Sequence, residues 1–534
     1  MDSLLLLGDE AIGQGALDAG ISGVYAYPGT PSTEITEYIQ ASREARQRNV
    51  HRVWSANEKT AMEEALGMSY AGKRALVYMK HVGLNVAADA FINAAITGIN
   101  GGMVVVVADD PSMHSSQNEQ DSRYYAKFAM IPVLEPATQQ EAYEATIKAF
   151  DLSEEFGLPV MLRITTRLAH SRSVIRRARS RKENVMMLPS DLKQFILLPA
   201  IARGRYQELL AKQEKLVESA EKSSYNVIQR GENKQTGIIA AGIGFNYVME
   251  NYNNGLLPFS ILKISHYPLP VNTIREFIGQ HENILVVEEG YPFIEESLIG
   301  ILGKVDNING KLNGVLPRTG ELNPGIVGKA LGIEIPSAFE VPELLVNRPP
   351  ALCRGCGHAD LYLALNEAMI EHGKGKVFSD IGCYTLGALP PFNSINTCVD
   401  MGASITMAKG AADAGMLPSV CVIGDSTFTH SGMTGLLDAV NEKTPVTIII
   451  SDNSTTGMTG GQKSSATGRL QQICLGLGVE PEHLKMLVPL KKNHEKNVDA
   501  LKAELAYNGV SVIIAQRECI QTAARRVRAS KTVS

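Results

Sequence analysis

The stretch GDSTFTHSGMTGLLDAVNEKTPVTIIISDN, residues 424–453, decides the fold class of this chain. The apolar run SVCVI at 419–423 precedes it, and a helix-like segment then leads to a second apolar run, TIII at 447–450. Alternating strands and crossover helices are typical of a parallel sheet covered by helices on both faces. The stretch therefore predicts a doubly wound α/β domain.

Both strands of this unit end in polar residues suited to a metal ion. Gly424 and Asp425 follow the first strand and Asn453 follows the second, with 27 residues between Asp425 and Asn453. The carboxyl ends of neighbouring parallel strands meet at the edge where open α/β sheets bind ligands. A carboxylate, an amide oxygen and a backbone carbonyl suit Mg²⁺ and leave positions for diphosphate and water. Gly424 and Gly432 would let the backbone approach the phosphates; the alternative is an ordinary strand-helix-strand unit with turn residues.

The rest of the chain repeats this alternation and predicts three α/β domains. Strand-like runs such as RALVYMK and GGMVVVVAD alternate with helix-like stretches over 1–170, and the alternation returns over 236–346 and 347–534. Between them, 171–235 is basic at its start and helical in pattern, so we expect a helical linker whose run SRSVIRRARSRK forms a solvated helix face. We expect three doubly wound, mostly parallel sheets, with a break at the Pro-rich NRPPALC of 347–353.

Composition excludes several classes of function. The chain has 534 residues, with 51 Lys plus Arg against 56 Asp plus Glu, so no basic surface for nucleic acid is implied. No apolar run approaches the roughly 18 residues of a membrane helix, and the N-terminus lacks the features of a secretory signal. We therefore expect a cytoplasmic protein without nucleic-acid or membrane partners. All 7 cysteines lie between residues 353 and 519, and this odd, one-sided set favours ligands or buried thiols over a disulfide framework.

The 424–453 stretch resembles the thiamine diphosphate motif, which begins with Gly-Asp and ends with Asn. By that resemblance Asp425 and Asn453 ligate Mg²⁺ through their side chains and Thr455 through its carbonyl, with Gly424 and Ser426 against the cofactor. The motif often has Asn at the position of Asp452, a departure that leaves the ligand position intact.

A thiamine cofactor also needs a carboxylate that hydrogen-bonds its aminopyrimidine ring. HRVWSANEKTAMEEALG at 51–67 reads as strand, Asn turn and helix, which places Glu58 at a helix start. Glu63 and Glu64 fall inside that helix. Glu58 is therefore our candidate, and the alternative is a helix-start charge favoured by the dipole.

Further motifs extend the resemblance to one enzyme family. AYPGTPSTEI at 26–35, YMKHVGLNVAAD at 78–89 and ADDPSMHSSQNEQDSR at 108–123 resemble the large subunits of indolepyruvate:ferredoxin oxidoreductases, a branch of the 2-oxoacid:ferredoxin oxidoreductases. The resemblance implies that arylpyruvates are oxidatively decarboxylated to aryl-acetyl-CoA and CO2, with electrons passed to ferredoxin. It also implies a small partner subunit, coenzyme A as a co-substrate and a dimer of heterodimers.

The same resemblance assigns the predicted domains. It implies a pyrimidine-binding domain at 1–170 and a helical linker at 171–235. A small domain like the C-terminal domain of transketolase follows at 236–346, and a domain that binds diphosphate and Mg²⁺ occupies 347–534. Thiamine diphosphate would then lie between the first and the last of these domains.

Four cysteines predict a second cofactor site. Cys353 and Cys356 form a C-x-x-C pair, Cys383 lies 27 positions beyond Cys356, and Cys519 follows the last strand. Four thiolates can hold a [4Fe–4S] cluster, and pyruvate:ferredoxin oxidoreductase-like enzymes have a similar set near thiamine. We expect such a cluster here, with zinc or reduced thiols as alternatives. The other cysteines are expected in the core: Cys398, Cys421 and Cys474.

Family members often continue into a ferredoxin-like module with a C-x2-C-x2-C-x3-C run. This sequence stops at Ser534 without that run, so we expect electrons to leave through another subunit or a free carrier. The runner-up function is a non-oxidative thiamine-dependent 2-oxoacid decarboxylase, which needs no cluster. A further alternative is a thiamine-binding structural subunit whose partner does the chemistry.

Smaller candidates are open to more than one interpretation. His81 follows a strand and could protonate or steer the substrate, and Thr30 could bind the substrate carboxyl group or the cofactor, although both also fit structural turns. Arg123 could pair with a substrate carboxylate, but a surface salt bridge is the favoured interpretation. Three histidines are left as polar turn residues: His114, His358 and His430.

Overall fold

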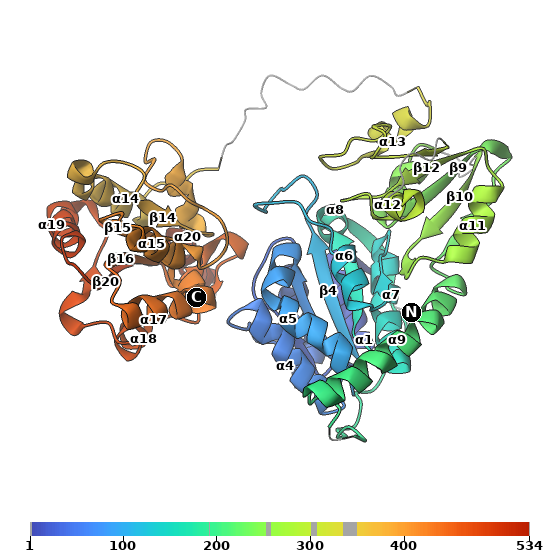
Figure 1. The fold of residues 1–534 in the computed structure, drawn as a ribbon, viewed down its shortest axis with the longest axis horizontal. Helices are drawn as coiled ribbons and strands as arrows, with labels where there is room; N and C mark the ends of the chain where they lie inside the picture. The colour runs from blue at the N-terminus through green and yellow to red at the C-terminus, as the bar shows by residue number, and fades with distance from the viewer. Residues whose placement is uncertain (1–2, 192, 253–257, 301–306, 335–349, 533–534) are drawn as a thin grey trace. The chain divides into compact units, whose positions relative to one another are not determined.

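The computed structural model describes residues 3–191, 193–252, 258–300, 307–334 and 350–532 (Figure 1). The chain divides into two compact units, Met1–Phe339 (unit 1) and Glu340–Ser534 (unit 2). Unit 1 contains two large sheets and unit 2 contains a third, so the prediction of three α/β sheets is confirmed. Residues 347–349 of the predicted break at 347–353 lie outside the described residues, and residues 350–353 are irregular chain.

The first sheet of unit 1 has six strands in the order β11, β5, β6, β4, β3, β2, all parallel except β11. Unbroken apolar runs suit strands that are buried on both faces, and the predicted runs form the central strands. The strands are β2 (Gly23–Tyr25), β3 (Ala75–Lys80), β4 (Met103–Asp109), β5 (Val133–Leu134), β6 (Val160–Thr165) and β11 (His266–Tyr267).

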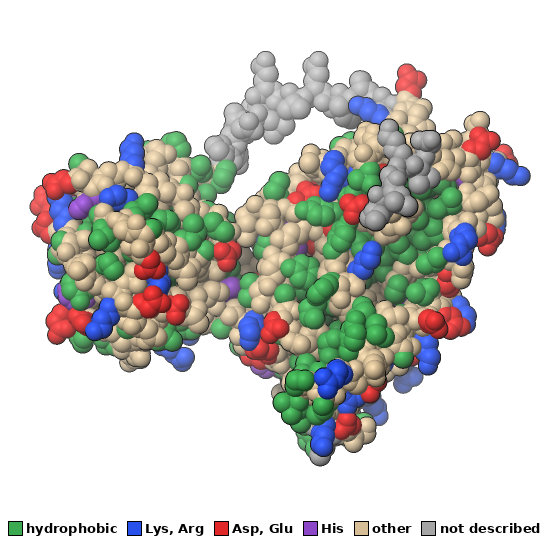
Figure 2. Space-filling model, viewed as in Figure 1, with side chains coloured by type: hydrophobic (Ala, Val, Ile, Leu, Met, Phe, Trp, Pro, Cys, Tyr) green, Lys and Arg blue, Asp and Glu red, His purple; other side chains and the backbone are tan. Residues whose placement is uncertain are grey.

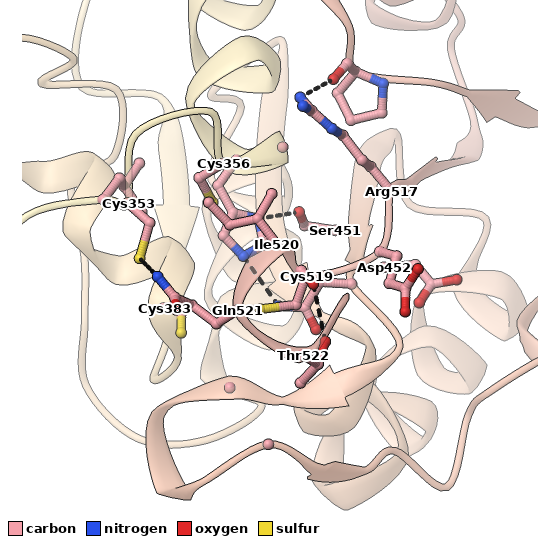
Figure 3. A pocket seen from close by; sticks show the side chains of 18 of the residues that line it. Cys353, Cys356, Cys383, Ser451, Asp452, Arg517, Cys519, Ile520, Gln521 and Thr522 are labelled. Carbon is pink, nitrogen blue, oxygen red and sulfur yellow. Dashed lines mark hydrogen bonds between the residues drawn. The ribbon is translucent and has the colours of Figure 1, made fainter. Parts of the chain in front are cut away.

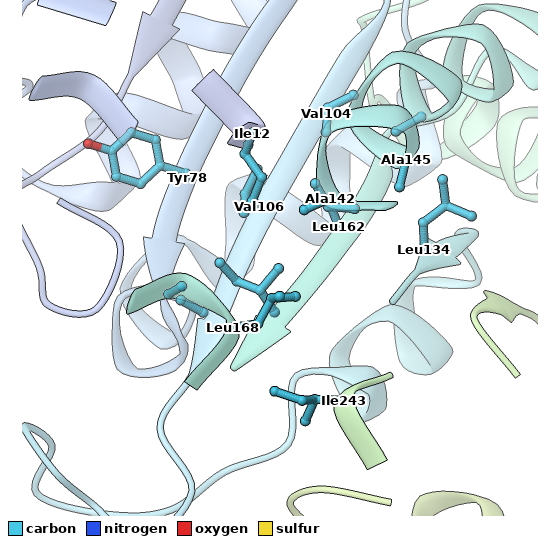
Figure 4. Close-up of a cluster of buried hydrophobic side chains, with 14 of the residues drawn as sticks. Ile12, Tyr78, Val104, Val106, Leu134, Ala142, Ala145, Leu162, Leu168 and Ile243 are labelled. Carbon is cyan, nitrogen blue, oxygen red and sulfur yellow. The ribbon is translucent and has the colours of Figure 1, made fainter. Parts of the chain in front are cut away.

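Helices cover both faces of this sheet, and successive strand residues face opposite layers. Val104 and Val106 belong to the hydrophobic layer that contains residues of α1 (Gly8–Asp18) and α7 (Gln139–Phe156), part of which Figure 4 shows. Their neighbours Val105 and Val107 belong to the opposite layer, under α4 (Glu58–Tyr70) and α5 (His81–Thr97). The sheet is therefore doubly wound, as predicted.

The second sheet of unit 1 has five strands in the order β13, β12, β9, β10, β8, with only β8 antiparallel to its neighbour. Its side chains continue the two hydrophobic layers of the first sheet, which joins both sheets in one unit. The strands are β8 (Val227–Gln229), β9 (Asn233–Ala241), β10 (Phe259–Ile264), β12 (Asn283–Val287) and β13 (Ile308–Asn309). Its helices are α10 (Ile243–Met249), α11 (Val271–Gly279), α12 (Phe293–Ile299) and α13 (Pro324–Ala330).

The segment 171–235 differs from the predicted helical linker. Its start forms β7 (Arg172–Arg176), which pairs antiparallel with β1 (Ser3–Leu7), and its helix α9 spans only Pro199–Glu221. The basic run is therefore a strand and extended chain, and the prediction of a helix face is wrong. The physical reason is that its arginines reach carboxylates of the helices beside the first sheet: Arg177 pairs with the buried Asp18 of α1 at 2.5 Å.

Unit 2 is built on one parallel sheet in the order β14, β15, β16, β20, β19. Its strands are β14 (Val377–Ser379), β15 (Ser419–Gly424), β16 (Val446–Asp452), β19 (Leu484–Leu487) and β20 (Val510–Gln516). One face is covered by α14 (Gly357–Ala368) and α19 (His494–Leu505), the other by α15 (Ala403–Asp413), α17 (Met433–Glu442) and α18 (Leu470–Gly476). The register pairs Gly424 with Ser451, so β15 and β16 end at the same edge.

Within the described part of the chain, no helix is long and apolar enough to cross a membrane. Acidic and basic side chains are interspersed on the face shown in Figure 2.

Candidate functional site

The predicted metal ligands of unit 2 lie on neighbouring strand ends. Asp425 begins the short helix α16 (Asp425–Thr427) directly after β15, and Asn453 follows β16. The Asp425 carboxylate lies beside the backbone N–H of Asn453 and the hydroxyl of Ser464. The Oδ1 atom of Asn453 accepts a hydrogen bond from the backbone N–H of Thr455 at 3.1 Å. The structure thus brings together the three residues that the motif predicted.

Asp425 has the environment of a carboxylate that needs a cation. The residue is 2% exposed, and its Oδ2 atom has no hydrogen-bond partner. Burial, reinforced by the charge of Asp452, raises its pKa to about 7. A buried, unpartnered anionic oxygen is destabilising unless a positive charge neutralises it. The carboxylate, the Asn453 amide oxygen and the Thr455 carbonyl fit a Mg²⁺ ion.

The four predicted cysteines line one cavity of about 240 Å³ in unit 2, and Figure 3 shows them around the same hollow. They come from three segments far apart in sequence: Cys353 and Cys356 before α14, Cys383 after β14, and Cys519 before α20 (Ile520–Thr532). Burial raises the pKa of Cys383 to about 12, and the other three thiols add to the rise. A thiolate at this position therefore needs a positively charged partner.

The spacing of the sulfurs bears on which metal suits the cavity. Among the described residues, no three of these sulfurs all lie within 4.8 Å of one another. A tetrahedral zinc ion with Zn–S bonds of about 2.3 Å holds its sulfurs roughly 3.8 Å apart. An iron-sulfur cluster binds each thiolate at a different iron and so needs a wider arrangement. As placed in the structure, no three of the four sulfurs are therefore as close together as a tetrahedral zinc ion would hold them.

The cysteine cavity adjoins the metal-ligand residues. His358 and Asn453 line it, and a Cβ on Gly457 would lie 3.1 Å from Cys383 Sγ and 3.9 Å from Asn453 Nδ2. His358 Nδ1 lies 2.6 Å from Ser451 Oγ, and Nε2 lies 3.3 Å from Asn453 Nδ2. His358 is therefore a buried residue of α14, 3% exposed, and the prediction of a turn residue is wrong. Its position two residues after Cys356, at a helix start, is the signal that could have found it.

Glu58, the candidate carboxylate of unit 1, is the first residue of α4. The side chain of Asn57 caps the helix by accepting from the N–H of Thr60 at 2.8 Å. The predicted strand before this turn is wrong: the chain makes a single bridge at His51, because it runs beyond the edge strand β2. Glu58 is 5% exposed and packs against Gly83, where a Cβ would lie 2.6 Å from Glu58 Oε1.

Thr30 and a lysine that sequence analysis missed lie near the same loop. The carbonyl of Thr30 accepts from Ser115 Oγ at 3.2 Å, and Lys80 Nζ donates to the Ser115 carbonyl at 2.8 Å. Burial lowers the pKa of Lys80 to about 8, opposed by nearby carboxylates that include Glu58. Its position at the carboxyl end of β3, directly before His81, could have drawn attention to it.

His81 is the first residue of α5 and is 1% exposed. Its Nε2 atom lies 3.1 Å from the carbonyl of Asn118, whereas its Nδ1 atom is buried and has no hydrogen-bond partner. One ring nitrogen is thus engaged by the 108–123 loop, and the other is available for a ligand.

Two further side chains lie elsewhere than expected. Arg123 is 1% exposed and pairs with Glu288 at 2.9 Å, so it is not a surface salt bridge; chain segments from both sheets of unit 1 bring buried carboxylates to it. Cys398 is exposed, because it lies in irregular chain after β14, and its assignment to the core is wrong. Cys421 and Cys474 are buried as predicted.

Comparisons with known proteins identify the family. Residues 14–197 match the family described as pyruvate flavodoxin/ferredoxin oxidoreductase, thiamine diP-binding, and residues 380–529 match the C-terminal TPP-binding domain of thiamine pyrophosphate enzymes. The indolepyruvate oxidoreductase subunit IorA of Archaeoglobus fulgidus is 40% identical over 97% of this chain and 86% of its own length. The subunit IorA of Pyrococcus horikoshii is 38% identical over the same shares.

A solved structure shares the fold. The 2-oxoglutarate:ferredoxin oxidoreductase from Magnetococcus marinus aligns with a TM-score of 0.50 at 18% identity, over 62% of this chain and 65% of that chain. Its resemblance is one of fold, and the family follows from the sequence matches. This chain belongs to the family of the IorA subunits of indolepyruvate oxidoreductases, within the thiamine diphosphate-dependent 2-oxoacid:ferredoxin oxidoreductases.

Proposed function

We propose that this chain is the catalytic subunit of an enzyme that oxidatively decarboxylates arylpyruvates. One arylpyruvate and one coenzyme A would give one aryl-acetyl-CoA, CO2, a proton and two electrons, and the electrons would pass singly to ferredoxin. The observation that carries this proposal is the cavity lined by Cys353, Cys356, Cys383 and Cys519, which adjoins Asn453 of the thiamine motif. The location that fits this chemistry is the cytoplasm.

The residues described above have distinct proposed roles. Thiamine diphosphate, when bound, supplies the electron sink for decarboxylation. Glu58 would hydrogen-bond its aminopyrimidine ring, since the residue is buried against a glycine that leaves it room. Asp425, Asn453 and Thr455 would hold Mg²⁺ and thereby the diphosphate. The residues expected at the cofactor or substrate are Gly424, Ser426, Thr30 and His81. His81 would contact the ligand through Nδ1, the ring nitrogen that has no hydrogen-bond partner in the described part of the structure.

The four cysteines would hold a [4Fe–4S] cluster that accepts electrons one at a time. An oxidative route to ferredoxin needs such a one-electron centre, whereas a non-oxidative decarboxylase needs none. The names of the curated relatives support indolepyruvate-like substrates. The Magnetococcus marinus enzyme was solved with coenzyme A and succinyl-CoA bound, which supports a thioester product. We further propose a smaller partner subunit and a dimer of heterodimers.

Metal analysis and electron paramagnetic resonance test this proposal. Anaerobically purified protein should contain about four irons with matching sulfide per chain. A resonance signal should appear when indolepyruvate and coenzyme A are added and be absent without indolepyruvate. Cys383→Ser should lose the iron, while Cys398→Ser, at an exposed cysteine outside the cavity, should keep it. Zinc or no iron, with arylacetaldehyde as the product, would overturn the oxidative proposal and favour the decarboxylase.

A further inference from the structure

We propose that His358 is a positioning residue that, together with the backbone N–H of Thr455, holds the side-chain amide of Asn453 so that its Oδ1 atom is presented as a metal ligand. This inference rests on the proposed role of Asn453. His358 follows Cys356 by two residues in the sequence, and in the structure it contacts Asn453.

His358 is held in one orientation by the two strand-end residues that it contacts. Its Nδ1 atom lies 2.6 Å from Ser451 Oγ and its Nε2 atom 3.3 Å from Asn453 Nδ2. The ring also packs edge-on against Tyr384, with centroids 6.2 Å apart. The backbone N–H of Thr455 selects the amide oxygen of Asn453, so the amide nitrogen faces Nε2 of His358. Nε2 is then the acceptor, and the proton lies on Nδ1, from which Ser451 Oγ can accept.

The amide of Asn453 is then constrained from both sides. Its Nδ2 atom donates to the imidazole, and its Oδ1 atom accepts from the N–H of Thr455 at 3.1 Å. A rotated amide would place two donors against each other at Thr455, and at His358 it would require the other tautomer of the ring. The oxygen is therefore directed toward the turn whose Thr455 carbonyl is the next candidate ligand. Groups that orient a ligand in this way raise metal affinity without contacting the metal.

The fold explains why this histidine reaches the site. His358 is the second residue of α14, which follows Cys356 and packs on the face of the sheet that contains Ile449 of β16. Ser451 and Asn453 continue β16 at its carboxyl end. The start of α14 therefore meets the end of β16, and the histidine joins the cysteine segment to the metal-ligand turn.

Mg²⁺-dependent binding of thiamine diphosphate, measured by titration calorimetry, tests the inference. His358→Leu should raise the Kd by about 10- to 100-fold, the usual range for groups that orient metal ligands. His358→Gln should restore most of the affinity, because its amide can accept from Asn453 and donate to Ser451. His494→Gln is the matched control, since that histidine pairs with Glu367 at the surface, and its Kd should not change.

A double-substitution experiment separates orientation from general support. In the Asn453→Asp background both side-chain oxygens are equivalent, so adding His358→Leu should change the Kd little. Equal losses with and without Asn453→Asp would overturn the inference, because a merely structural histidine would cost the same in both backgrounds. The inference would also be overturned if His358→Leu bound thiamine diphosphate with the same Kd as the wild type. If the wild-type protein itself shows no Mg²⁺-dependent binding, the proposed function fails instead.

Discussion

The two units differ in whether basic side chains neutralise the buried carboxylates at the carboxyl ends of their strands. In unit 1, the guanidinium groups of Arg123 and Arg163 have no solvent exposure and neutralise a group of acidic side chains. The acidic partners are Asp109, Asp121, Glu135 and Glu288. In unit 2, by contrast, no described Lys, Arg or His side chain forms an ion pair with the buried Asp425, and its Oδ2 atom has no hydrogen-bond partner.

The arginines outweigh burial most clearly at Asp121, whereas burial still raises the pKa of Asp109 and of Glu288. Burial would raise the pKa of Asp121, yet Arg123 and Arg163 lower it to about 2. Burial raises the pKa of Asp425 to about 7, and no guanidinium group opposes it. A carboxylate that the chain itself neutralises belongs to the fold, whereas one left without a partner is available to a ligand.

The largest expected effect comes from breaking the neutralised group. Arg163→Met removes contacts to Asp109 at 2.7 Å and Glu135 at 2.5 Å and leaves buried carboxylates unpaired. The free energy of unfolding should fall by about 3–5 kcal/mol. Denaturant unfolding measures this change. Arg181→Met, which removes an exposed pair with Asp151, should cost less than about 1 kcal/mol, and equal losses in both variants would contradict the comparison.

Asp425→Asn should weaken cofactor binding without lowering the stability of the protein. The substitution keeps the volume and removes the charge, so Mg²⁺-dependent binding of thiamine diphosphate should weaken by at least about 100-fold. The protein without cofactor should be as stable as the wild type or more stable, because no buried charge remains. Calorimetry and thermal unfolding measure the two effects.

The control for this prediction is Asp438→Asn on the exposed face of α17. It should change neither cofactor affinity nor melting temperature. A destabilised Asp425→Asn protein with normal cofactor binding would place Asp425 among the structural carboxylates.

The unit 2 site was predictable because its signals are local. Asp425 and Asn453 follow apolar runs, and neighbouring parallel strands end at one edge by geometry. The grouping of Cys383 and Cys519 with the C-x-x-C pair was predicted only from the family resemblance. The contact between His358 and Asn453 was not predictable, because it depends on the packing of α14 against the sheet.

The unit 1 features were harder to predict because they depend on distant segments. The carboxylates around Arg123 come from segments of both sheets, so no local pattern reveals that it is buried. Strands β1 and β7 pair although they lie more than 150 residues apart in the sequence. Most residues of β7 are exposed, so its sequence lacks the alternation of apolar and polar residues that would predict a strand. Lys80 is the last residue of the apolar strand β3, and the sequence of this strand does not indicate which groups the lysine contacts.

A third prediction concerns Glu58, a buried carboxylate of unit 1 that we assign to function. A Cβ at Gly83 would lie 2.6 Å from Glu58 Oε1, so Gly83→Ala should displace that carboxylate. Small misplacements of reacting groups can lower rates by up to about 100-fold, and we expect turnover to fall by about 10-fold or more. Steady-state kinetics with indolepyruvate measure this effect.

Gly67→Ala is its matched control, since a Cβ there has no atom within 4 Å. Both glycines lie in helices, where alanine is favoured by up to about 1 kcal/mol, so neither variant should unfold. Unchanged turnover in Gly83→Ala would show that the position of Glu58 does not matter for the reaction.

The smallest effect is expected at Asp9, which tests the comparison within unit 1. Asp9 is fully buried near Glu34 and His170, and its carboxyl group faces the Glu34 carboxylate without a basic partner of its own in an ion pair among the described residues. Burial, together with the Glu34 charge, raises its pKa well above the ordinary value. The wild type should therefore lose stability as the pH rises from the ordinary aspartate range toward the raised pKa. Asp9→Asn has no charge to lose and should be more stable near neutral pH by about 1 kcal/mol.

Thermal unfolding of both proteins from pH 4 to pH 8 measures this difference, with Asp151→Asn at the surface as the control. The stability gap should widen as the pH rises, because only the wild type must keep a carboxylate neutral or bury its charge. A variant that is less stable than the wild type, with a wild type that chelators also destabilise, would mean that a cation occupies Asp9, Glu34 and His170. Asp9 would then belong with Asp425 among carboxylates kept for a ligand, and the contrast would lie between sites rather than between units.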